Sequence, residues 1–142
     1  MEFKMKMKNQ KGVAAVEFAL VLPLFLLITF GIIEFSLALY DQAVITNASR
    51  EAARYGIVLT KPSALQIQQV ATNYCSNHLI SFGTGGNTCP SGNITVAGDG
   101  GQYGTPLTVT VKYQFTPLAL GNLISPLSGA LSLSATTVMY NE

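Results

Sequence analysis

The segment KGVAAVEF (residues 11–18) and the uncharged run that follows it to residue 33 decide how this chain folds. Four lysines gather at its start, at positions 4, 6, 8 and 11. Glu17 lies five residues after Gly12, and no further charge occurs until Glu34. A helix needs about 20 residues to cross the hydrocarbon core of a membrane. The sequence therefore predicts a span at about residues 15–34, with both glutamates near the membrane surfaces.

Charge is scarce and unevenly distributed over the 142 residues. Only 11% of the residues are charged, and the mean hydropathy is +0.37. Residues 1–12 carry four lysines and one glutamate, whereas the other 130 residues carry four bases and six acids. Because the basic excess flanks an apolar run rather than covering a folded face, no nucleic-acid partner is expected. The positive-inside rule predicts a cytoplasmic N-terminus and places the residues after about 40 across the membrane.

Two other interpretations of the apolar run stay open. One is a cleaved secretory signal with residues 36–38 (SLA) as a small-x-small site. The apolar run exceeds the usual length of about 7–15 residues for such signals, and Glu34 lies just before the cut. The other is a signal anchor without processing, which leaves Glu17 without a role.

The helix is predicted to continue beyond the membrane, over residues 13–58. No proline or glycine interrupts residues 32–55, and Gly56 is a candidate C-cap. Pro23 is expected to kink the membrane portion, because it removes a backbone hydrogen bond. Arg50, Glu51 and Arg54 form either a solvated face or, together with Glu34, a candidate contact with another subunit. Helical spacing predicts the following face on the protruding part: Tyr40, Val44, Asn47 or Ala48, Glu51 or Ala52, and Tyr55.

Residues 62–142 are predicted to form a small extracytoplasmic unit. A second helix is expected at residues 62–80, with Pro62 at its first position. Residues 107–115 alternate strictly between apolar and polar side chains, as a half-buried strand does. Shorter or weaker patterns predict strands at residues 94–96 and 131–139. Residues 118–129 are predicted to form an apolar connection between strands. The predicted class is therefore α+β, with an antiparallel sheet of about three strands.

Cys75 and Cys89 are the only cysteines. With one pair and no histidine cluster they do not make a zinc site, which leaves a disulfide or two unpaired thiols. A bridge between them would close a loop of about 15 residues and stabilise the unit by roughly 3 kcal/mol. We expect the disulfide, because a unit of this size barely supplies a sufficient core by itself.

No catalytic arrangement can be assembled from this composition. His78 is the single histidine, and no neighbouring residue in the sequence recommends it as a base. The glycine-rich residues 82–104 lack the spacing of a phosphate-binding loop. The chain is therefore expected to be structural rather than an enzyme, without cofactor or metal.

Three stretches carry a resemblance to a known family: residues 15–23 (AVEFALVLP), 31–35 (GIIEF) and 47–55 (NASREAARY). Together with the Gly12-to-Glu17 spacing they resemble the TadE-like minor pilins (pseudopilins) of tight-adherence, Flp-type pilus systems. The final strand, with residues 131–139, is similar to the way such proteins end, although it is far less diagnostic.

The resemblance implies that residues 1–12 are a prepilin-type leader. A prepilin peptidase would cut between Gly12 and Val13 and would recognise Glu17 and Phe18. Glu17 would then pair with a free N-terminal amine, of its own chain or of a neighbouring subunit. Val13 as the first mature residue departs from the methionine or phenylalanine of many type IV pilins.

The implied role is assembly of the pilus, as initiator, tip or adaptor. The expected partners are the prepilin peptidase, other minor pilins, the major pilin, inner-membrane lipid and the pilus assembly platform. The expected location is a bacterial inner membrane, with residues 62–142 in the periplasm or carried into the pilus. Two alternatives remain: a pseudopilin similar to those of type II secretion, and a membrane-anchored binding module.

Overall fold

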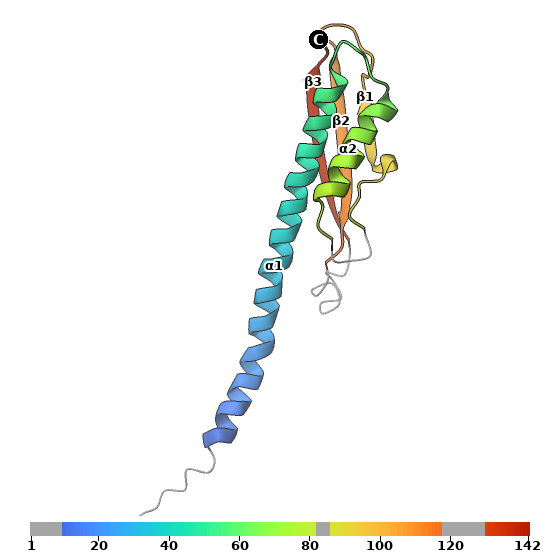
Figure 1. Ribbon diagram of the computed structural model, residues 1–142. Coiled ribbons are helices and arrows are strands. Elements are labelled where there is room, and N and C mark those ends of the chain that lie inside the picture. Colours follow the sequence, from blue (N-terminus) through green and yellow to red (C-terminus); the bar gives the residue numbers. More distant parts are fainter. Residues whose placement is uncertain (1–9, 82–85, 118–129) are drawn as a thin grey trace, which may run out of the picture.

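A computed structural model describes residues 10–81, 86–117 and 130–142. The elements follow the order α1 (Gln10–Gly56), α2 (Ala64–His78), a 3₁₀ turn (Ser91–Asn93), β1 (Ile94–Ala97), β2 (Pro106–Phe115) and β3 (Leu131–Tyr140). The long helix α1 projects away from a small unit built on its C-terminal half (Figure 1). The predicted α+β class, with a second helix and three antiparallel strands, is confirmed.

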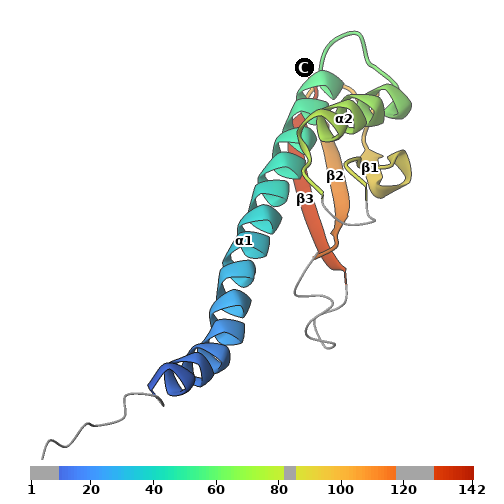
Figure 2. The ribbon, with the colours of Figure 1, turned by 60° about the horizontal axis from the view of Figure 1, so that its bottom comes forward.

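The sheet has the order β1-β2-β3, and both pairs of neighbours are antiparallel (Figure 2). In the centre of the sheet, Val109 lies opposite Val96 on one side and Thr137 on the other. After Pro106, the apolar residues of β2 all point inward, as the alternation predicts. They are buried: Leu107, Val109, Val111, Tyr113 and Phe115.

Helix α1 contributes the other half of this core. It contacts β2 and β3, while α2 contacts α1 and β1. The buried positions of α1 recur every three or four residues, so they form one stripe along the helix. Half of them are alanines, which allows the helix to lie close to the sheet. The stripe consists of Glu34, Ala38, Asp41, Ile45, Ala48 and Ala52. The core of the distal unit therefore includes the last part of α1.

This stripe only partly matches the face predicted from the sequence. Val44, Ala48 and Ala52 are buried as expected. Tyr40 and Tyr55 are exposed instead, because the inward direction passes through Asp41 and Ile45, one residue further along. The apolar pattern alone misplaced the face, since two of its buried members, Glu34 and Asp41, are acidic.

Gly56 is the last residue of α1, and it does not adopt the left-handed conformation of a glycine cap. Its lack of a side chain leaves room for neighbouring core residues. A Cβ atom at this position would overlap the side chains of Leu107 and Ile67. Both of these side chains are fully buried between α1, α2 and β2. A glycine here therefore lets the end of α1 pack directly on the core.

The start of α2 differs from the prediction that Pro62 is its first residue. The N-cap is Ser63, and Pro62 lies one position outside the helix. The Ser63 N–H donates to Gln66 Oε1 over 2.9 Å, so the side chain at the third helical position satisfies the backbone of the cap. Asp99, from the turn before β2, accepts a hydrogen bond from the Ala64 N–H over 3.1 Å.

Candidate membrane and assembly segment

The first turn of α1 contains the predicted cleavage site. The helix begins at Gln10, so Gly12 and Val13 are both helical. An added Cβ atom at Gly12 would have nothing within 4 Å. The peptide bond after Gly12 is thus free of side-chain cover, but it lies in a helical turn. A peptidase would need to unwind this turn, which a glycine weakens by about 1 kcal/mol relative to alanine.

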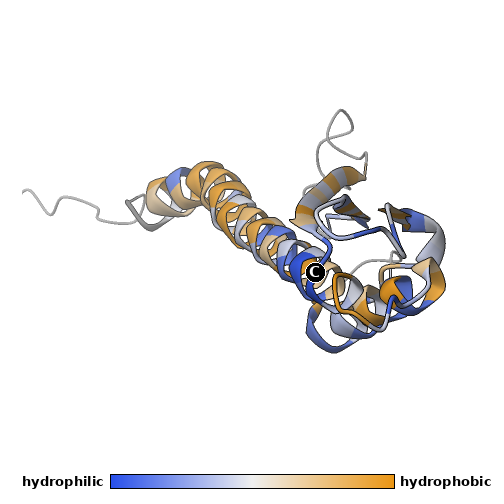
Figure 3. Ribbon diagram, turned by 90° about the horizontal axis from the view of Figure 1, so that it is seen from above, coloured by the Kyte–Doolittle hydropathy of each residue, from blue (hydrophilic) through white to orange (hydrophobic). Residues whose placement is uncertain are grey.

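The membrane-length part of α1 has no buried face of its own. By length and composition α1 can cross a membrane, and no residue of its most apolar 18-residue window is buried in the chain. Figure 3 shows apolar residues around this part of the helix and a more mixed distal unit. A helix that is apolar on all sides needs apolar surroundings. The exposed residues include Val13, Val16, Phe18, Leu20, Val21, Leu24, Phe25, Ile28 and Ile32.

The helix continues through Pro23 without interruption, and it curves gently along its length (Figure 1). The residue is exposed, as are its neighbours in sequence on the C-terminal side. The predicted loss of one backbone hydrogen bond at Pro23 therefore does not end the helix.

Glu17 lies on this exposed part of α1, four residues after Val13. Side chains four residues apart lie on the same face of a helix, one turn from each other. The amine that cleavage after Gly12 would create belongs to Val13. The carboxylate of Glu17 is therefore one turn away from that amine in the same chain, and it is also accessible to a neighbouring one.

The four candidate subunit-contact residues have different environments. Arg50, Glu51 and Arg54 are exposed on the distal half of α1. Glu34 is only 6% exposed and has an interaction partner within the chain. Glu34 is thus part of the intramolecular packing of the distal unit, whereas the other three are available to another molecule.

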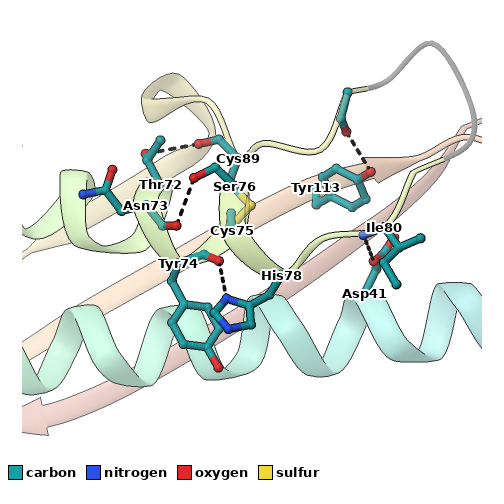
Figure 4. The surroundings of a disulfide bond; sticks show 11 residues. Asp41, Thr72, Asn73, Tyr74, Cys75, Ser76, His78, Ile80, Cys89 and Tyr113 are labelled. Carbon is teal, nitrogen blue, oxygen red and sulfur yellow. Dashed lines mark hydrogen bonds between the residues drawn. A yellow bond between two sulfur atoms is a disulfide. The ribbon is translucent and has the colours of Figure 1, made fainter.

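The disulfide joins Cys75 of α2 to Cys89, with the two Cα atoms 5.7 Å apart (Figure 4). Both cysteines are fully buried. The Thr72 hydroxyl donates to the Cys89 carbonyl over 3.2 Å, and the Tyr113 hydroxyl donates to the Gly86 carbonyl over 3.1 Å. The predicted disulfide is therefore present, and it attaches the segment after α2 to the core.

His78 lies at the exposed C-terminal end of α2. Its ring stacks on Tyr74 with 4.3 Å between the ring centres, and Nδ1 is 2.9 Å from the Tyr74 carbonyl. These are local contacts within one helix. Among the described residues, no three His, Cys, Asp or Glu side chains form a group that could hold a metal ion.

Asp41 is a buried acid that the sequence did not single out. Its side chain is fully buried between α1 and the segment after α2. Oδ1 accepts the Ile80 N–H over 3.2 Å, and within the described part of the chain Oδ2 has no hydrogen-bond partner. Burial raises the pKa of this carboxyl group above its ordinary value, while the hydrogen bond from Ile80 opposes the rise.

A comparison with known families gives a match over the long helix α1. Residues 12–54 match the model of a family described as TadE-like protein. The match covers almost the whole of α1 but only about a third of the chain, and over these residues the chain is similar to the TadE-like family. This similarity associates the chain with Tad pilus systems, in which the TadE-like family is structural. No curated protein and no solved structure matches the chain.

Proposed function

We propose that this chain is a structural minor pilin, or pseudopilin, of a Tad-type pilus, and that it acts in assembly rather than catalysis. The observation that carries the proposal is the division of α1 into two halves. The N-terminal half is apolar and exposed on all sides, while the C-terminal half is built into the core of a folded unit. One rigid helix thus connects an apolar environment to an exported domain.

The apolar half would first lie in the inner membrane, with its N-terminus in the cytoplasm. The lysines before residue 12 favour this orientation. The disulfide supports export of the distal unit, because such bonds persist in oxidising compartments such as the bacterial periplasm. Neighbouring pilin helices could replace lipid around this half of α1 during assembly, since both surroundings are apolar.

Processing would occur between Gly12 and Val13 by a prepilin peptidase. The new amine of Val13 and the carboxylate of Glu17 would then neutralise each other, within the chain or between neighbours. An unpaired carboxylate is costly in hydrocarbon, about 2.5–3.5 kcal/mol at the membrane centre. Pairing between subunits would therefore also fix how far one helix is shifted along the next.

The distal unit would provide specific contacts with the major pilin, with other minor pilins and with the assembly platform. Arg50, Glu51 and Arg54 are exposed on the stem of this unit and can take part in such contacts. A separate folded unit of this kind suits an initiator, tip or adaptor subunit. Such a subunit binds specific partners rather than repeating along the filament.

Substitution of Gly12 tests this proposal in cells that make the pilus. Cells lacking the chain are expected to lose their pili, and the wild-type chain to restore them. Gly12→Leu is expected to leave an uncut precursor and few pili. Gly92→Leu is the matched control, because an added Cβ atom at either glycine has nothing within 4 Å.

The readouts are the number of pili per cell by electron microscopy and the size of the chain on a gel. Normal pili in cells without the chain would contradict a role in assembly and would favour a membrane-anchored binding module. A cut Gly12→Leu chain would contradict processing at this bond.

A further inference from the structure

The buried Asp41 is used by nothing in the proposed assembly role, yet it lies at a junction between two parts of the fold. Two neighbouring residues of α1 form hydrogen bonds with the end of α2 and the segment just after it, and Figure 4 shows the one between Asp41 and Ile80. The Tyr40 hydroxyl donates to the His78 carbonyl over 3.1 Å. The Ile80 N–H donates to Asp41 Oδ1 over 3.2 Å. We call these two hydrogen bonds the α1–Ile80 junction.

This junction positions the loop that the disulfide closes. His78 and Ile80 both lie between Cys75 and Cys89 in the sequence. The disulfide fixes the two ends of this loop to each other, but it does not attach the loop to α1. The hydrogen bonds from Tyr40 and to Asp41 make that attachment.

The two hydrogen bonds respond differently to protons. The bond from Tyr40 joins two neutral groups. The bond to Asp41 involves a carboxyl group that is 0% exposed and has one oxygen without a partner in the described residues. Ionisation of such a group in a buried site is costly, because nothing replaces the water that would solvate the charge.

Among the residues that the structure describes, no positively charged group compensates the charge of Asp41. From β2, Tyr113 faces Asp41, and this acid contributes to the raised pKa of the Tyr113 hydroxyl, for which burial is the largest cause. On its own helix, Glu34 lies two turns earlier. His78 lies two residues before Ile80, with its ring on Tyr74. Residues 82–85 and 118–129 contain no ionisable side chain.

We infer that Asp41 makes the α1–Ile80 junction a proton-sensitive contact, which holds the disulfide-closed loop most firmly on α1 when the carboxyl group is protonated. In the protonated form, the carbonyl oxygen still accepts the Ile80 N–H and no charge is buried. In the ionised form, the junction carries an uncompensated charge and opens more readily. This inference does not depend on the proposed role in pilus assembly.

The sign of the effect follows from the raised pKa of Asp41. Between the ordinary aspartate pKa, about 3.9, and the higher value in the folded chain, the closed junction binds a proton that the open one releases. Closure therefore weakens as the pH rises through this window, by up to about tenfold per pH unit. Above the window it stays at its weaker level.

Hydrogen exchange at the Ile80 amide, measured by NMR on the full chain in detergent micelles, tests the inference. After correction for the intrinsic exchange rate, the protection of Ile80 is expected to fall between pH 4 and the raised pKa, at up to about tenfold per pH unit. Asp41→Asn keeps an acceptor for the Ile80 N–H but cannot ionise, so its protection should not change with pH.

Asp99→Asn is the matched control, because Asp99 also accepts a backbone N–H, from Ala64, but is exposed. It should keep the wild-type fall at Ile80. A flat wild-type profile, or an equal fall in Asp41→Asn, would overturn the inference.

Should Asp41→Asn fail to fold, carboxyl NMR of the wild-type chain decides the question. A midpoint for Asp41 above the ordinary aspartate value of about 3.9 is expected. A midpoint at or below that value would refute the inference.

Discussion

Replacing Glu17 by alanine is expected to abolish pilus assembly while leaving the amount of chain in the membrane unchanged. In the assembled state, the carboxylate would pair with an N-terminal amine among apolar helices. Removing one partner of a buried ion pair costs about 3–5 kcal/mol, which is a change of a hundredfold or more in an association equilibrium. Insertion should not suffer, because the substitution removes a charge from an apolar helix. Pili counted by electron microscopy and chain recovered in the membrane fraction provide the two readouts.

Two further variants test whether the loss of assembly comes from the missing charge of Glu17. Glu17→Gln keeps the size and the hydrogen-bonding atoms but loses the charge, so it should assemble nearly as poorly as the alanine variant. Glu142→Gln removes another exposed carboxylate, from the distal unit, and should assemble normally. Normal pili with Glu17→Ala would show that the pairing role is wrong, even if cleavage after Gly12 still occurs.

Removing the disulfide with Cys75→Ala and Cys89→Ala together is expected to lower the stability of the distal unit by about 3 kcal/mol, as a 15-residue loop predicts. For a unit of this size, each kcal/mol corresponds to about 4–8 °C in Tm. We therefore expect a fall of roughly 12–24 °C. Near-UV circular dichroism of the full chain in detergent should follow this unfolding, because several tyrosines lie in the distal unit and α1 should stay helical in the micelle.

Chemical reduction of the wild-type chain is the control for this pair of substitutions. Both cysteines are fully buried, so alanine also leaves small cavities, whereas reduction breaks the bond without removing atoms. Similar falls in Tm for the two treatments would assign the effect to the bond. An unchanged Tm on complete reduction would show that the bond does not stabilise the unit.

Much of the fold follows from local sequence patterns. The strict alternation of residues 107–115 predicted β2 within one residue, since Pro106–Phe115 is its observed range. The absence of proline and glycine between residues 32 and 55 correctly predicted one long helix. Cys75 and Cys89 could be paired because no other cysteine competes. In each case a single physical rule, applied to neighbouring residues, was sufficient.

Features that depend on distant contacts could not be predicted in the same way. Asp41 and Glu34 are polar, so hydrophobic periodicity assigned them to no core face, although the sheet and the segment after α2 bury Asp41. The role of Gly56 depends on Leu107 and Ile67, which approach it only in the folded chain. Ser63 and Gln66 do carry a local capping signal, which predicts the observed start of α2 better than Pro62 does.

The residues of the apolar segment could be named from the sequence because their signal is local. The glycine, the glutamate five residues later and the apolar run are all contained in residues 12–33. The structure adds that Gly12 is helical and uncovered and that this half of α1 packs against nothing in the chain. The surroundings of this apolar half of α1 must therefore be supplied by other molecules.

The N-terminus of the mature chain tests the central claim most directly. Intact-mass spectrometry of the chain purified from membranes of pilus-forming cells is expected to give a mass that begins at Val13. Such a start would mean that the segment at residues 11–18 is a prepilin processing site. A chain that begins after Ala38, or one that retains Met1, would contradict the pilin account.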